Sequence, residues 1–375
     1  MFNLLAGPLG RVVKLHSIVI DNQLFRLHYN ATTLLLVFFS ILVTSTQYFG
    51  DPISCVQHDS IPNNVLKTFC WLHGTFNLPE AYNKTVGPKG VPYSGIDKFT
   101  PGERKTYFLY YQWVCFVLFL QAMAFYAPHW IWKLYEGGLV KKLVQDLDCP
   151  VKDRNEVCGK AAVVAKYIST HLGLHACYFY AYVFTETLNF VNVVAQILLT
   201  DRFLGNMFTT YGTDVLKHSE MNPEVRNDPM SRIFPRLTKC TFHMFGTSGD
   251  VQKYDALCIL AQNIINEKIY IFLWFWWVVL ALGTGIAVGY RLATIMMPRL
   301  RHILLKNRAR ITDRRTVDSV MRRLRAADWF LVYQLSKNMH PVHFRIFLQE
   351  LSQEFSTTDG SRLLTKENES NTTSV

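Results

Sequence analysis

Four of the eight cysteines are the side chains whose chemistry is easiest to interpret, because they fall in pairs within two long polar stretches. Cys55 and Cys70 lie in the first stretch, and Cys240 and Cys258 lie in the second. Disulfides persist outside the cell, whereas metal-binding thiols need a reducing compartment or close C-x-x-C spacing. We therefore expect disulfides at these positions, and the four cysteines allow three connectivities.

A second set of chemically active groups interrupts an apolar stretch. Polar residues recur there every three or four positions, which places them on one face of a helix; they are Glu186, Asn189, Asn192 and Gln196. An ionisable group at membrane depth costs several kcal/mol unless it meets a partner or water. Glu186 is therefore either a functional group or part of a structural stripe that hydrogen-bonds to neighbouring helices.

Catalytic chemistry finds little support in the sequence. His171 and His175 are spaced to share a helix face and to bind a metal, but the clustered histidines that a two-iron site needs are missing. No phosphate-binding loop, nucleophile elbow or H-E-x-x-H motif is present. We expect no enzyme activity, no catalytic residue, no metal and no cofactor.

The elements that must position these groups are four apolar blocks in a chain that is half hydrophobic and 14% aromatic. Each block has the roughly 20 residues that span about 30 Å of hydrocarbon. We assign spans to residues 28–48, 107–132, 178–200 and 269–292. The predicted fold is an all-α membrane protein, a four-transmembrane-helix bundle with two disulfide-stapled extracellular loops and helical cytoplasmic regions.

Orientation follows from the basic residues beside the spans, because cytoplasmic loops carry an excess of Lys and Arg. A run of arginines begins at Arg291, at the end of the fourth span, and Lys141 and Lys142 follow the second. Residues 1–27, 133–177 and 293–375 are thus predicted to be cytoplasmic, and the loops 49–106 and 201–268 extracellular. The basic tail suits anionic membrane lipids better than nucleic acid.

Two short motifs suggest modification and partner binding. Asn83 opens an N-glycosylation sequon, Asn83-Lys84-Thr85, in the first outer loop. Thr373 and Val375 match the C-terminal pattern that adds as a strand to PDZ domains. The Ser/Thr-rich residues before that terminus are typical of a solvated, disordered tail.

Several longer strings carry a family resemblance. They are Tyr110-Tyr111-Gln112-Trp113-Val114, Gly50-Asp51-Pro52-Ile53-Ser54-Cys55, Phe69-Cys70-Trp71, Phe234-Pro235-Arg236-Leu237-Thr238-Lys239-Cys240, Asn266-Glu267-Lys268-Ile269-Tyr270 and Asp328-Trp329-Phe330. With two cysteines per outer loop, the chain resembles the innexins, and most of all the insect members, over roughly residues 15–350.

The resemblance implies a subunit of an oligomeric, large-pore gap-junction channel in the plasma membrane that passes ions and small metabolites between adjacent cells. About eight subunits, alone or mixed with other innexins, would form a ring that docks on a ring of the adjacent cell. The implied disulfides are Cys55–Cys258 and Cys70–Cys240. The implied pore-lining candidates are Met1, Phe2, Asn3, Gln47 and Asp51. Two alternatives stay open: an undocked hemichannel that releases small molecules, and a four-pass adhesion or scaffold protein.

Overall fold

The computed structural model describes residues 18–56, 61–84, 86–87, 90–149, 153–220 and 229–372. The chain divides into two compact units, each assembled from separate segments. Unit 1 comprises Met1–Arg26, Pro128–Leu188 and Gly285–Val375, and unit 2 comprises Leu27–Ala127 and Asn189–Thr284. The N-terminal candidates Met1, Phe2 and Asn3 and the C-terminal candidates Thr373 and Val375 lie outside the described residues.

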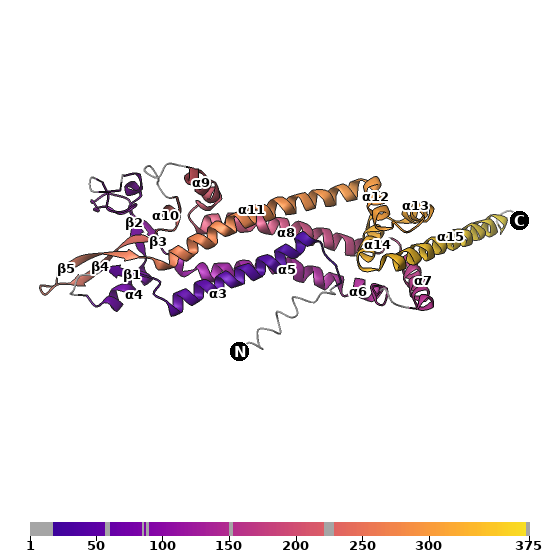
Figure 1. The fold of residues 1–375 in the computed structure, drawn as a ribbon, viewed down its shortest axis with the longest axis horizontal. Helices are drawn as coiled ribbons and strands as arrows, with labels where there is room; N and C mark the ends of the chain where they lie inside the picture. The colour runs from indigo at the N-terminus through magenta and orange to yellow at the C-terminus, as the bar shows by residue number, and fades with distance from the viewer. Residues whose placement is uncertain are drawn as a thin grey trace. The chain divides into compact units, whose positions relative to one another are not determined.

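Four helices are long and apolar enough to cross a bilayer (Figure 1), which confirms the four predicted spans. The first span, Gln23–Phe49, consists of α2 (Gln23–Arg26), η1 (Leu27–Thr32) and α3 (Thr33–Phe49). The others are α5 (Val114–Glu136), α8 (Ala176–Phe203) and α11 (Ala261–Met296). Where the bilayer begins and ends along these helices stays a prediction.

The first span changes its helical pitch within unit 2. Residues Leu27–Thr32 form a π-helical segment, in which the Thr32 hydroxyl donates to the Leu27 carbonyl at 2.9 Å. Trp276 of α11 in turn donates its indole N–H to the Thr32 hydroxyl at 2.9 Å. Single π-helical turns occur frequently at functional positions in helices, and this one lies in the same span as the pore-lining candidate Gln47.

Unit 2 also contains a five-stranded antiparallel sheet, which the sequence analysis did not predict. The strands are β1 (Ser54–Val56), β2 (Thr75–Asn77), β3 (Thr106–Phe108), β4 (Leu237–Phe245) and β5 (Val251–Ile259), in the order β1-β5-β4-β2-β3. Helical segments beside them are α4 (Asn63–His73), η2 (Pro79–Asn83), η3 (Tyr110–Gln112), α9 (Phe208–Glu220) and α10 (Pro229–Ile233). Strands from both predicted outer loops therefore share one sheet.

Aromatic side chains form much of the core of unit 2. Trp277 of α11 packs against Phe125 of α5, with ring centroids 6.2 Å apart, and against Phe208 of α9 at 5.8 Å. Tyr270 stacks on Phe234 at 5.4 Å. Hydrocarbon tails are as apolar as leucine, so helices in a bilayer gain specificity from packing of this kind rather than from the hydrophobic effect.

Unit 1 is helical apart from its connecting turns in the described ranges. Besides parts of the long helices it contains α6 (Leu139–Val144), α7 (Arg154–Thr170), α12 (Pro298–Arg308), α13 (Arg314–Arg323), α14 (Ala326–Asn338) and α15 (Pro341–Thr372). Helix α15 packs on α7 and α13, and α14 buries most of its length, including Trp329, Phe330 and Leu331. The predicted disorder beyond residue 357 stays a prediction.

Candidate functional site

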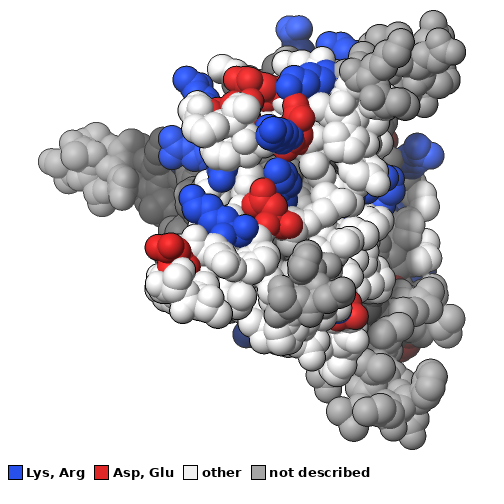
Figure 2. Space-filling view, turned by 90° about the vertical axis from the view of Figure 1, so that its left-hand side faces the viewer, with Lys and Arg blue, Asp and Glu red and all other residues white. Residues whose placement is uncertain are grey.

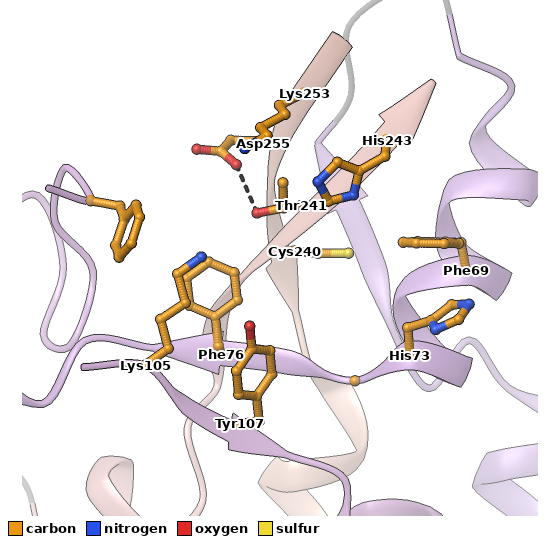
Figure 3. A pocket seen from close by; sticks show the side chains of 12 residues that line it. Phe69, His73, Phe76, Lys105, Tyr107, Cys240, Thr241, His243, Lys253 and Asp255 are labelled. Atoms are coloured by element: carbon orange, nitrogen blue, oxygen red, sulfur yellow. Dashed lines mark hydrogen bonds between the residues drawn. The ribbon is translucent and has the colours of Figure 1, made fainter. Parts of the chain in front are cut away.

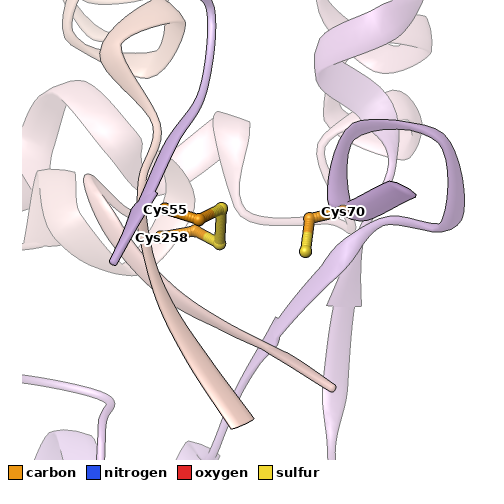
Figure 4. A group of neighbouring side chains, drawn as sticks. All are labelled: Cys55, Cys70 and Cys258. Atoms are coloured by element: carbon orange, nitrogen blue, oxygen red, sulfur yellow. A yellow bond between two sulfur atoms is a disulfide. The ribbon is translucent and has the colours of Figure 1, made fainter. Parts of the chain in front are cut away.

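Two disulfides join the two predicted outer loops to each other. Cys55 of β1 lies directly opposite Cys258 of β5 in the strand register, with Cα atoms 4.0 Å apart (Figure 4). Cys70, in the last turn of α4, is bonded to Cys240 of β4, with Cα atoms 5.8 Å apart. The pairing is the one that the innexin resemblance implies. We call this part of unit 2 the stapled module; it consists of the five strands, α4, η2, the described residues between η2 and β3, and the disulfides.

The sulfur atoms of Cys55, Cys70 and Cys258 lie within 4.8 Å of one another, which by distance alone resembles a metal site. Each of these sulfurs is consumed in a disulfide. Only the deprotonated thiolate is a good metal ligand. The cluster is therefore structural in its oxidised form.

Aromatic residues of the resemblance strings pack around the disulfides. The rings of Trp71 and Tyr111 lie 4.6 Å apart, and Phe69 meets Phe242 edge-on at 4.9 Å. Gln112 donates its side-chain amide to the Trp71 carbonyl. These contacts tie η3, which precedes α5, to α4, and α4 to β4, so the residues that carry the resemblance hold the stapled module together.

Strands β4 and β5 extend beyond the rest of the sheet as a two-stranded ribbon (Figure 1). β1 pairs only with Leu257–Ile259, and β2 pairs with β4 only at Lys239. The pairing of β4 with β5 continues to Phe245 and Val251, whose side chains are exposed. In the described part of the chain no further strand covers the ribbon edges, and uncovered edges readily pair with another chain.

A cavity of about 410 Å³ opens beside the base of this ribbon (Figure 3). Its lining is aromatic and basic, with Phe69, His73, Phe76, Lys105 and His243 among its residues. The Lys105 ammonium lies 4.3 Å from the ring centroid of Phe76, a cation–π contact. Such a lining suits an aromatic or acidic side chain better than an aliphatic one.

Charges of both signs are interspersed on the face that carries β4 and β5 (Figure 2). Pairs in the stapled module include Lys84 with Asp97 at 2.5 Å and Lys239 with Asp255 at 3.8 Å. Hydrogen bonds from the Lys84 ammonium and a backbone N–H lower the pKa of Asp97, so this carboxylate is charged at neutral pH. A mixed-charge surface favours specific pairing with a complementary protein over diffuse binding to one type of charge.

Two pore-lining candidates lie near the start of the stapled module. Asp51 is highly exposed and faces the Lys67 ammonium at 3.4 Å. Gln47 is half-buried at the end of α3 and accepts a weak hydrogen bond from Cys115 at 3.8 Å. Both leave polar atoms at the surface of unit 2, and their place in a pore stays a prediction.

The polar stripe of α8 is mainly buried, and its acidic member has a charged partner. Glu186 accepts hydrogen bonds from Arg291 of α11 at 2.6 and 3.3 Å and from Asn22 at 2.6 Å. Both charged residues are less than a tenth exposed. A buried ion pair needs such bidentate geometry to offset the cost of desolvation, so Glu186 is a paired buried charge, and its role stays a prediction.

The other members of the stripe lie in unit 2. Asn189 and Gln196 are buried, and Asn192 is half-buried and accepts a hydrogen bond from Gln196 at 3.3 Å. The amide of Asn189 has no hydrogen-bond partner within the described part of this single chain. An unpaired buried amide is costly, and at 1% exposure this one is closed off from the surface of the chain.

His171 and His175, the i and i+4 pair, do not converge on a metal. His171 Nδ1 lies 2.8 Å from the Tyr167 carbonyl, and His175 Nδ1 lies 3.0 Å from the carboxylate of Asp328. Asp328 also accepts the Gly173 N–H at 3.1 Å. His175 thus joins the start of α8 to α14, whereas His171 bonds the last turn of α7.

Sequence reasoning missed three contributors to these sites. Arg291 was counted only as a charge that sets orientation, and Asn22 and Asp328 were assigned no role. The signal for Asp328 was present, because it opens one of the strings that carry the resemblance. Nothing local identifies Arg291 as the partner of Glu186, because 105 positions separate them.

Comparison with known proteins gives one consistent family. The family model described as Innexin matches residues 21–355. The chain is 47% identical over 349 residues to "Innexin inx2" of Schistocerca americana, which covers 93% of this chain and 97% of that protein. It is 45% identical to "Innexin inx2" of Drosophila melanogaster, covering 95% and 96%, and 41% identical to "Innexin shaking-B" of the same species, covering 95% of each.

Proposed function

Since the chain belongs to the innexin family, whose members are subunits of gap-junction channels, we propose that it conducts ions and small metabolites passively between adjacent cells and catalyses no reaction. The stapled module is the observation that carries this proposal. Its disulfides, its uncovered ribbon and its mixed charges form a rigid surface suited to another protein. Selectivity would come from pore width and lining groups.

The pore itself requires several copies of the chain. Four helices from one chain are too few to enclose a wide channel, so we infer that the lining forms only on assembly. We propose a ring of about eight subunits, homomeric or mixed with other innexins, with Met1, Phe2, Asn3, Gln47 and Asp51 along the permeation path. The exposed carboxylate of Asp51, which faces the Lys67 ammonium at 3.4 Å, supports a place beside a water-filled path.

Both termini are proposed to be cytoplasmic and the stapled module extracellular. The disulfides support this orientation, because they persist outside the cell and rarely in the cytosol. The arginines of α12 and α13 support it too, since basic residues flank the cytoplasmic ends of spans and attract anionic lipids. A PDZ partner at Thr373 and Val375 rests on the sequence alone.

Docking is tested by dye transfer between paired cells that express the chain. We expect transfer in wild type and its loss in Cys70→Ser and Cys240→Ser, because each variant removes a bond between the two outer loops. Cys177→Ser, at an exposed free cysteine of α8, is the matched control and should transfer normally. Full transfer in the Cys70 or Cys240 variant would show that the disulfide does not support docking.

An undocked hemichannel is the second candidate, and the exposed sequon favours it. Asn83 lies exposed at the end of η2 in the stapled module, where a glycan would keep two modules apart. Glycosidase treatment of the cell-surface protein, compared with the Asn83→Gln variant, tests whether Asn83 is glycosylated. Dye uptake by single cells without transfer would support the hemichannel, and the absence of both would support an adhesion protein.

A further inference from the structure

The short stretch that leads into the first span is held at its backbone by side chains of α14. Asn338 accepts the Val19 N–H at 2.6 Å and donates to the Val19 carbonyl at 2.9 Å. Gln334 donates to the Ile20 carbonyl at 3.4 Å. A side-chain amide that bonds both backbone groups of one residue imitates a neighbouring strand and fixes the orientation of that residue. The C-terminal region thus holds the chain immediately before α2.

The first residues of the span are held by a second set of contacts. Asn22 precedes α2 and accepts the Phe25 N–H at 2.6 Å, as an N-cap does. Its amide nitrogen also donates to Glu186 at 2.6 Å. Phe25 is buried and stacks on Tyr182, with centroids 6.2 Å apart. The start of α2 is therefore fixed to α8 by the Asn22–Glu186 hydrogen bond and the Phe25–Tyr182 ring contact.

Helix α14 is itself fixed to the same charges. The Arg291 guanidinium lies 4.9 Å from the ring centroid of Tyr182 and 5.2 Å from that of Phe330 in α14. Asp328, 1% exposed, bonds the Gly173 N–H and the His175 ring. A shift of α14 would thus expose or unpair buried charges, which is costly. The anchors of Val19, Ile20 and Asn22 thus belong to one connected set of contacts.

We propose that Asn338 and Gln334 of α14, with the Glu186–Arg291 pair, position the inner end of the first span and thereby set the conductance of the channel. This inference rests on the proposed function, because it matters only if the first span lines the pore. Asn338 and Gln334 are positioning residues, since they act on permeation through the backbone they hold. A binding partner or modification that displaces α14 would alter permeation without touching the pore.

The test is the unitary conductance of single channels in cells that express one variant each. Asn338→Leu keeps the size of the side chain and removes both hydrogen bonds to Val19. We expect its unitary conductance to differ from wild type by about twofold or more, because the lining is no longer held in one geometry. Gln353→Leu, an exposed change on α15, is the matched control and should conduct like wild type.

Asn338→Asp is the second variant. It keeps the acceptor for the Val19 N–H but places a charged oxygen against the Val19 carbonyl, so it should also shift the conductance. If both variants lower only the number of channels and keep the wild-type unitary conductance, α14 is merely structural and the inference is wrong. If wild type conducts nothing, the proposed function fails first and the inference falls with it.

A measurement on purified protein keeps the test decisive when a variant does not reach the membrane. Backbone hydrogen exchange over residues 19–26 should become roughly tenfold faster in Asn338→Asp than in wild type, because the loss of about one hydrogen bond favours local opening by that factor. Unchanged exchange in this stretch would overturn the proposal irrespective of channel activity.

Discussion

The two disulfides of the stapled module join the same two loops, so each shortens the loop that the other closes. This coupling determines how much the removal of one disulfide destabilises the module. Fifteen positions separate Cys55 from Cys70, and eighteen separate Cys240 from Cys258. Once one disulfide is formed, the other closes a loop of roughly 33 residues rather than one of about 170 or more. Loop-closure entropy then gives about 4 kcal/mol for either disulfide in the presence of the other.

Replacing Cys70 and Cys240 together by alanine removes one disulfide and leaves no free thiol. The free energy of opening the stapled module should fall by about 4 kcal/mol, which makes open states roughly a thousandfold more frequent. Hydrogen exchange of the amides of β4 and β5 in detergent-solubilised protein measures this directly. The reciprocal pair, Cys55 and Cys258, should give a loss of the same size, and Cys177→Ala should give none.

A loss of less than about tenfold in protection for either pair would refute the reasoning, because the strand pairing and the aromatic core would then hold the module without the staples. A large loss confined to one pair would also contradict it. The two loops have the same effective length when the other bond is intact, so chain entropy alone predicts equal effects.

Two further predictions concern stability in detergent, measured by thermal unfolding. Gly212→Ala would place a Cβ 2.1 Å from the ring of Trp274, so it should destabilise the protein by about 1–3 kcal/mol. Gly289→Ala is the control, because a Cβ there meets no atom within 4 Å and should leave stability unchanged or raise it. Burial, and then neighbouring arginines, lower the pKa of Lys337 from 10.5 to about 8. Between these two values the unfolded chain binds a proton that the folded chain does not, so stability should rise with pH by about 3 kcal/mol across that window. Lys337→Met should remove the rise, and Lys306→Met, at an exposed lysine, should keep it. A rise of equal size in both lysine variants, or equal unfolding temperatures for the two glycine variants, would contradict these assignments.

The membrane spans could be predicted because the signal for them is local. About 20 consecutive apolar residues suffice to identify a span, whatever the rest of the chain does. The ends of the helices were harder to predict from the sequence. Helix α11 continues to Met296, four residues past the predicted boundary at 292. Helical backbone does not stop at the edge of the hydrocarbon, so hydropathy cannot locate the end of the helix.

The local hairpin of β4 and β5 was missed although its strands are neighbours in sequence, whereas the pairing of β1 and β2 with these strands is distant in sequence. Cys55 of β1 lies opposite Cys258, 203 positions further along the chain, and β2 meets β4 at Phe76 and Lys239. Three of the strands have only three residues each, too short for an alternating pattern to be seen. The disulfide pairing likewise came from the family resemblance, since spacing alone left three connectivities open.

In the candidate site, too, residues with a local sequence signal could be predicted and residues whose role depends on distant contacts could not. Glu186 could be recognised because a carboxylate within an apolar stretch is rare in itself. Its partners could not, because Arg291 lies in another span and Asn22 lies before the first one. A single buried charge indicates that a partner exists, and only the fold identifies that partner.

The need for such partners follows from the solvent around the spans. In water, burial of apolar surface would hold helices together, but in a bilayer lipid satisfies that surface equally well. Specific arrangement must then come from groups that lipid cannot satisfy, such as the Glu186–Arg291 pair and the backbone-binding amide of Asn338. Replacement of such a group by a lipid-compatible side chain need not prevent insertion, because each span stays apolar. It should instead leave helices that insert but no longer hold one geometry, and the conductance of Asn338→Leu measures that loss.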